Sequence, residues 1–495
     1  MKQDLTVSKV NMAFSLILSV MCLTSPVLAK NQPQKTPPPE KLISQAPQLI
    51  NSGDTLTLES CINIAFKNNP NISHANNLAR VYQSRIGEAK AEYFPQLNLS
   101  TGYNRHNPII SASNSKGNNQ YSGNVNLNQL IYDFGKTSAR VKIQKLNLDS
   151  TNYDVDDVEV NTAYNVKMAY YQALSAKISK DIYTRTIKQN EQHLKQAKAF
   201  FEVGTKSKID IINAQVSLSN SKLNYMTADN GYNTAIANLN NAMGMPNAPE
   251  YTIADTLTFK RPESISANKE EFVANKAGKG SSSSDTVLKT GVEKNDILES
   301  LTLKKYDLSL DEAIIKAFAN RPDLKAVVTD ESAAKESVNL AKKDYLPTLS
   351  GSANYEIGGQ KFPLDENLSV GANINISVFN GFLTKNQVNE AKASLDVAAS
   401  NIEILKQNIY LQVKEAYINL TQAEKKIPVA ELIVKQAREN YELANGRYNA
   451  GVGNSTEVQD AETNYDNAQL SYVLAFYDYN TARINLEKAM GLKKQ

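Results

Sequence analysis

The sequence has no tryptophan, two cysteines and three histidines among its 495 residues. Cys22 lies in an N-terminal apolar segment, so a mature chain that keeps only Cys61 cannot form an intrachain disulfide. His74, His106 and His193 are scattered without metal-ligand spacing, and neither a phosphate-binding glycine loop nor a nucleophile elbow is present. We therefore expect no enzyme activity, no metal and no cofactor.

The chain also has no large excess of positive or negative charge. The chain has 54 basic and 51 acidic residues, which gives a formal net charge of +3. A nucleic-acid-binding protein would normally show a basic patch or stripe, whereas here the charges are spread along the chain as on solvated helix faces. A nucleic-acid partner is not expected.

Long apolar runs are absent after the N-terminus, so a membrane-spanning helix is excluded there. The N-terminus itself has two lysines, an apolar run over 12–23 and the small-x-small sequence Val27-Leu28-Ala29. We interpret residues 1–29 as a cleaved secretory signal peptide. A lipid anchor on Cys22 is disfavoured because methionine precedes that cysteine where a small residue is wanted. An exported chain of this kind can enter a membrane only as a closed β-barrel.

The rest of the chain is one unit written twice, over residues 56–244 and 308–491. The matching pairs include Asn69-Pro70 with Arg321-Pro322, Tyr93-Phe94-Pro95 with Tyr345-Leu346-Pro347, Gly204 with Gly451, and Met243-Gly244 with Met490-Gly491. Around the two copies lie an N-terminal flexible segment (30–55), an inter-repeat linker (245–307) and a C-terminal tail (492–495). The duplication predicts a pseudo-symmetric architecture.

Each copy predicts the same series of elements: a short helix that ends before a proline, a second helix, two strands, a very long helix, a glycine turn and a return helix. The predicted strands lie at about 96–104 and 121–131 in the first copy and at about 348–357 and 368–378 in the second. In all four, apolar residues alternate with asparagine, serine or glycine. Each has one apolar and one neutral polar face.

These strands fit a membrane as well as a soluble sheet with one wet face. Strand number favours the membrane. Four strands cannot close a water-filled barrel, and open strand edges in lipid are prohibitive. Three chains would supply twelve strands and remove every edge.

The return helices follow a seven-residue repeat of large and small residues, which predicts coiled-coil packing. In the second copy the repeat is Val458, Ala461, Tyr465, Ala468, Tyr472, Ala475, Tyr479, Ala482, Leu486 and Ala489. The long helices are predicted over about 136–201 and 385–447, each on the order of 95 Å long at ~1.5 Å per residue. Pro428 is expected to kink the second one.

Together these features resemble the TolC family of outer-membrane efflux factors. The most specific residues are Asn320-Arg321-Pro322-Asp323-Leu324, Tyr132-Asp133-Phe134-Gly135, Phe201-Glu202-Val203-Gly204, Asp210, Ala214 and Gln215. The resemblance implies a mainly α fold with transmembrane β: a long α-helical coiled-coil barrel that forms a periplasmic tunnel, and four strands per chain that complete a trimeric twelve-stranded β-barrel. It also implies a homotrimer in the outer membrane, a periplasmic adaptor protein, and an inner-membrane pump or ABC secretion ATPase.

The resemblance further implies site residues at the hairpin tips. Glu457 and Asp460 match the carboxylates that ring the periplasmic entrance, and Tyr448 and Asp210 match the residues of the entrance latch. A basic residue usually joins that latch, but glycine occupies its position here. The residues expected to dock the adaptor are Gly204, Thr205, Gly451, Val452 and Gly453.

Two questions stay open at the level of sequence. An exported coiled-coil adhesin or spacer would also explain the seven-residue repeats, although not the strands inside each copy. Within the export interpretation, efflux of small molecules and type I secretion of proteins have the same pattern, because the pump and adaptor select the cargo.

Overall fold

The computed structural model of the protein describes residues 50–106, 118–254 and 306–493. The predicted signal peptide (1–29), Cys22 and most of the flexible segment 30–55 lie outside the described residues. So do residues 107–117, the larger part of the 245–307 linker and the last two residues of the chain.

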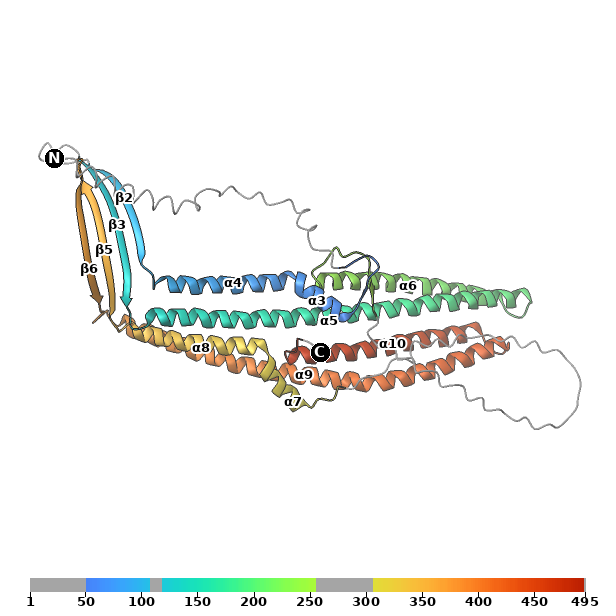
Figure 1. Ribbon diagram of the computed structural model, residues 1–495. Helices are drawn as coiled ribbons and strands as arrows, with labels where there is room; N and C mark the ends of the chain where they lie inside the picture. Colours follow the sequence, from blue (N-terminus) through green and yellow to red (C-terminus); the bar gives the residue numbers. More distant parts are fainter. Residues whose placement is uncertain (1–49, 107–117, 255–305, 494–495) are drawn as a thin grey trace, which may run out of the picture. The chain divides into compact units, whose positions relative to one another are not determined.

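The two copies contain the same four helices and two long strands in the same order, and the first copy also has the short paired strands β1 and β4 (Figure 1). The first consists of β1 (Thr55–Leu56), α3 (Leu58–Asn68), α4 (Pro70–Ala91), β2 (Gln96–His106), β3 (Asn118–Tyr132), α5 (Lys136–Glu202), α6 (Lys208–Ala242) and β4 (Thr252–Ile253). The second consists of α7 (Leu310–Asn320), α8 (Pro322–Lys343), β5 (Thr348–Gly359), β6 (Asp365–Asn375), α9 (Leu383–Asn449) and α10 (Ser455–Ala489). Corresponding helices have equal lengths of 11, 22, 67 and 35 residues. The α9 helix continues through Pro428 rather than ending there.

The break between the two short helices of each copy has a local cause. Asn69 has an extended backbone and caps α4 by accepting a hydrogen bond from the Asn71 N–H, and Pro70 fits the first helical turn. Gly244 packs against this break with φ +74°, and a Cβ on it would lie 2.8 Å from the Asn68 carbonyl oxygen. Gly491 packs equally closely on Arg321 in the second copy. The repeated glycines therefore let the end of each return helix approach the break.

The four long strands form one antiparallel sheet in the order β2-β3-β5-β6. Its register aligns residues of one kind in rows across all four strands. One polar row is Asn98, Asn126, Asn354 and Ser369, and the neighbouring apolar row is Leu99, Val125, Tyr355 and Leu368. The predicted alternation is thus a property of the whole sheet, which has one apolar face and one polar face; the polar face is mostly neutral, with Glu356 in the row of Asn124 and Asn367.

The long helices form two hairpins, α5 with α6 and α9 with α10, which meet where α5 packs on α10 (Figure 1). All ten residues of the α10 repeat are buried. In α6 the corresponding repeat is less covered: Ala214, Ser221, Ala235 and Leu239 are buried and the other positions are partly exposed. The difference arises because α10 packs on both α9 and α5, whereas α6 lies at the side of the unit.

Candidate functional site: hairpin tips and unpaired sides

Both hairpins reverse at a glycine in the left-handed backbone region, Gly204 with φ +77° and Gly451 with φ +78°. Beside these glycines, Val203 and Val452 are each 71% exposed. The Thr205 hydroxyl donates to the Phe200 carbonyl and closes the first turn. The two tips therefore present apolar side chains to the outside on tightly turned backbone.

Tyr448 is fully buried between the two tips, although it belongs to α9. Its ring lies 5.2 Å from the His193 ring and 5.8 Å from the Phe200 ring, and both of these residues are on α5. The Lys206 ammonium lies 4.7 Å from the centre of the Tyr448 ring. The first hairpin thus encloses the tyrosine of the second.

Asp210 lies in the same region, but its carboxylate is used locally. It accepts hydrogen bonds from the Ser207 N–H and hydroxyl at the start of α6, which is a capping arrangement. Burial and the nearby Asp210 carboxylate raise the pKa of Tyr448, whose hydroxyl has no hydrogen-bond partner among the described residues. Burial lowers the pKa of His193, and Asp210 opposes that shift. Tyr448 and Asp210 are therefore neighbours without a hydrogen bond between them.

The two predicted entrance carboxylates differ in surroundings. Glu457 lies in the first turn of α10 and forms an ion pair with Arg447 at 3.1 Å, whereas Asp460 is exposed. The Arg447–Glu457 pair is itself well exposed, so it adds little stability, but it partly neutralises Glu457.

Two further carboxylates of α10 escaped sequence reasoning: Glu462 is buried and Asp466 is half-buried. Glu462 is 5% exposed, and its Oε1 has no hydrogen-bond partner among the described residues. One turn later, Asp466 accepts a hydrogen bond of 3.0 Å from the Thr186 hydroxyl of α5. Burial, with a smaller contribution from Asp466, raises the pKa of Glu462 to about 8, and burial raises the pKa of Asp466 to about 6.

A buried ion pair joins the two hairpins farther from the tips. Lys167 of α5 donates to Glu487 of α10 at 2.7 Å, and both side chains are less than a tenth exposed. Arg483 pairs with the other oxygen of Glu487 at 3.0 Å. Since the carboxylate has two cationic partners, its burial is compensated.

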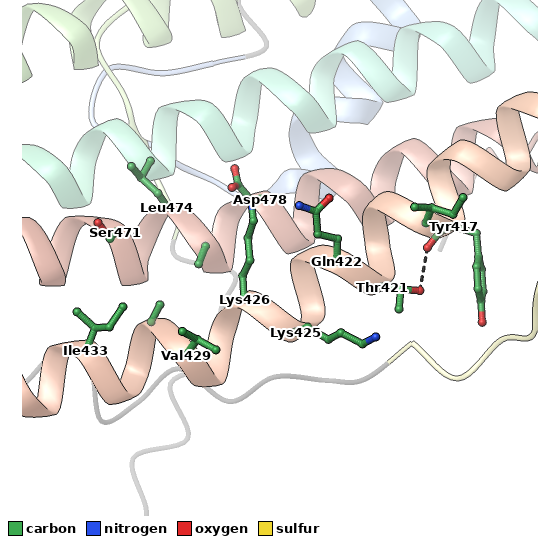
Figure 2. Close-up of a pocket in the computed structure, with 13 residues that line it drawn as sticks. Tyr417, Thr421, Gln422, Lys425, Lys426, Val429, Ile433, Ser471, Leu474 and Asp478 are labelled. Atoms are coloured by element: carbon green, nitrogen blue, oxygen red, sulfur yellow. Dashed lines mark hydrogen bonds between the residues drawn. The ribbon is translucent and has the colours of Figure 1, made fainter.

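The α9 helix has a second apolar stripe, on the side opposite its buried residues. It includes Val397, Ile404, Leu411 and Ile418 at seven-residue intervals, each about half exposed or more. The stripe continues into a groove of about 920 Å³ between α9 and α10. Figure 2 shows Val429 and Ile433 from α9 and Leu474 from α10 along this groove.

The α6 helix also has an apolar stripe facing away from its hairpin partner. The stripe consists of Ile209, Ile212, Val216, Leu223 and Met226, with exposures between 47% and 66%. Within the part of the chain that the structure describes, nothing covers it.

The sheet and both helical layers leave the same two sides of the chain unpaired. The sheet has β2 and β6 as its edges. The helices beside the sheet pack in the order α4-α5-α8-α9, and those toward the tips in the order α6-α5-α10-α9. One side of the chain is therefore β2, α4 and α6, and the other side is β6 and α9.

Exposed aromatic side chains gather at both ends of the sheet. Tyr121 contacts Tyr103 and Phe362 at one end, and Tyr132 contacts Phe134 at the other. The stretch of β3 from Tyr121 to Tyr132 is roughly 37 Å long at ~3.4 Å per residue, which at a tilt of about 40° covers roughly 28 Å. Aromatic girdles at this separation are typical of outer-membrane strands.

The described residues include no group of acidic, histidine or cysteine side chains that could hold a metal ion. Among these residues, no helix combines the length and apolar character needed to cross a membrane.

A sheet with one lipid-type face, carried on two long helical hairpins, defines the class of outer-membrane channel subunits with a helical tunnel. The sequence profile of the outer membrane efflux protein family matches residues 61–245 and 313–492, and the chain belongs to this family. It is an outer-membrane efflux or secretion channel of the TolC type that extends into the periplasm, and it is a transport protein rather than an enzyme.

Among curated relatives, the chain is 23% identical to outer membrane protein TolC of Escherichia coli (strain K12), covering 85% of this chain and 83% of that protein. It is 22% identical to protein CyaE of Bordetella pertussis, covering 88% and 84% respectively. Among solved structures, the Campylobacter jejuni CmeC outer membrane channel superposes with a TM-score of 0.66 at 17% identity, covering 88% of this chain and 85% of that one. The CusC channel gives 0.67 at 16% identity, covering 90% and 97%.

Several residues of this site escaped sequence reasoning. Lys206, His193 and Phe200 meet Tyr448 only because two distant segments come together, and no local motif marks such contacts. The capping role of Asp210 could have been found, since Ser207 and Asp210 have the spacing of a capping box.

Proposed function

We propose that three copies of this chain assemble side by side into a closed duct. The β2, α4 and α6 side of one copy contacts the β6 and α9 side of the next. A contact between two different faces closes into a ring when the rotation permits. The observation that carries this proposal is that the same two sides are unpaired in the sheet and in both helical layers.

The strand directions support closure. The sheet is antiparallel throughout and has four strands, so β6 of one copy runs antiparallel to β2 of the next. Two copies would give a barrel of eight strands, and side chains would fill its interior. Three copies give twelve strands and a wider lumen lined by the mostly neutral face of asparagine and serine. The apolar face, with its aromatic ends, contacts lipid.

In the helical part, the α6 stripe of one copy packs along α9 of the next and into the apolar groove between α9 and α10. Both surfaces are apolar and half-exposed in the single chain, which makes them complementary. The helices then close into a tunnel around the same axis as the barrel. The sheet edges and apolar stripes oppose the alternative of a coiled-coil spacer, which needs no closure.

At the tips, a periplasmic adaptor bound to an inner-membrane pump or ABC secretion ATPase docks on the turns around Gly204 and Gly451. The exposed Val203 and Val452 supply apolar contact there. Glu457 and Asp460, repeated around the axis, attract cations to the entrance. Tyr448 and Asp210 belong to the region that holds the entrance closed. The duct itself is passive, and its cargo is set by the pump.

The seam can be tested with two charge insertions on α6. Leu223→Lys places an ammonium in the exposed apolar stripe, and Asn224→Lys places the same charge on another exposed side of the helix. We expect Leu223→Lys to lower the yield of detergent-stable oligomer and the channel activity in planar lipid bilayers, while Asn224→Lys resembles the unaltered chain. Equal behaviour of the two variants would argue against this seam.

A further inference from the structure

Lys206 lies in the turn of the first hairpin but makes its polar contacts with the second. Its ammonium donates a hydrogen bond of 2.7 Å to the Gly453 carbonyl, across a separation of 247 residues. The same ammonium lies 4.7 Å from the centre of the Tyr448 ring. One side chain thus holds both the turn and the last helical residues of the neighbouring hairpin.

The acceptor side is shaped for this contact. A Cβ on Gly453 would lie 2.9 Å from the Tyr448 backbone nitrogen and 3.0 Å from the Arg447 carbonyl carbon. Glycine therefore lets the turn fold tightly onto the end of α9, which brings its carbonyl beside the tyrosine ring. Because Tyr448 is fully buried and Lys206 is half-buried, the contact is partly shielded from water, which strengthens it.

Neighbouring contacts hold the same two segments together. Gln196 of α5 donates to the Asn449 side chain of α9, and His193 lies 3.4 Å from the Ser455 hydroxyl. Within the described residues, Lys206 is the cation that reaches the Tyr448 ring. Asp210, whose carboxylate acts electrostatically on Tyr448, is engaged in capping α6.

We propose that Lys206 fastens the two hairpin tips of each protomer to one another through the Gly453 carbonyl and the Tyr448 ring, and so keeps the periplasmic entrance narrow. Lys206 is a positioning residue, which acts through the Gly453 carbonyl and the Tyr448 ring. The inference rests on the proposed function, because the tips form an entrance only in the assembled duct.

The test compares unit conductance in planar lipid bilayers. Lys206→Met keeps the apolar stem and removes the charge, and we expect a several-fold larger conductance than in the unaltered channel. Lys206→Arg keeps a cation and should stay close to the unaltered value. Lys208→Met is the matched control, since Lys208 is exposed at the same tip and loses the same charge. Lys206→Met with unaltered conductance, or Lys208→Met with an equal increase, would overturn the proposal.

A second variant acts from the other side of the contact. Gly453→Ala moves the acceptor carbonyl away without altering charge, so it should also enlarge the conductance, and an unaltered value would count against the proposal. Oligomer yield measured in parallel separates tip opening from loss of assembly. If the unaltered protein forms no channel, the proposed function fails. If it forms a channel whose conductance is the same in Lys206→Met, only this inference fails.

Discussion

Glu462 makes the stability of the protein depend on pH in a defined interval. Its carboxyl is buried on α10, and its pKa is raised from the ordinary 4.5 to about 8. Between these values the folded chain keeps a proton that the unfolded chain has released. Stability therefore falls as pH rises from about 4.5 to 8 and levels off above that.

Other groups leave the upper part of this interval free. The pKa of Asp466 is about 6, so the contribution of its proton to stability is already lost when the pH has risen to about that value. The pKa of His193 is lowered from 6.5, so the pH range in which His193 affects stability lies below 6.5. From pH 6.5 to 8.5, Glu462 should thus cost about 2 kcal/mol of folding free energy per chain, at ~1.36 kcal/mol per pH unit.

The measurement is denaturant unfolding of the detergent-solubilised protein at pH 6.5 and 8.5, followed by helical circular dichroism. The unaltered chain should lose about 2 kcal/mol between the two values, whereas Glu462→Gln should lose little. Glu439→Gln, at an exposed position of α9, is the control and should keep the loss. The reasoning is refuted if Glu462→Gln shows the same pH dependence as the unaltered chain.

Three further outcomes are expected from single contacts. Lys167→Met should destabilise the protein by about 3 kcal/mol in the same unfolding assay because Glu487 loses a buried partner, and Lys167→Arg should cost much less; equal losses would contradict the role of the charge. Gly244→Ala should lower the melting temperature, since it strains a positive φ at a cost of about 1–3 kcal/mol and sets a Cβ 2.8 Å from a backbone oxygen; an unaltered melting curve would disprove this. Replacing both Glu457 and Asp460 by alanine should weaken block by multivalent cations in single-channel recordings, and unaltered block would refute a carboxylate ring.

The repeating parts of this fold could be predicted from sequence because they depend on periodicity. Tyr465 and Tyr472 are buried in α10 as their seven-residue spacing requires, and Asn126 and Asn354 share the polar face that their alternation indicated. The family resemblance added the expected entrance residues, which periodicity could not supply and which stay a prediction.

Contacts between the two copies could not be predicted in the same way. The Lys206 contact with Gly453 and the Lys167 pair with Glu487 join residues 247 and 320 positions apart. Their partners are decided by how the first hairpin lies along the second, and the composition of each segment would suit a solvated surface equally well. Likewise, the buried position of Glu462 on α10 is occupied by a residue type that usually faces water.

Ring closure by three copies is the claim on which the proposed duct depends. Native mass spectrometry of the protein, extracted from outer membranes in detergent, counts the chains directly. The account predicts a particle of three copies that survives removal of the detergent. A particle of one chain under conditions that preserve channel activity would contradict it.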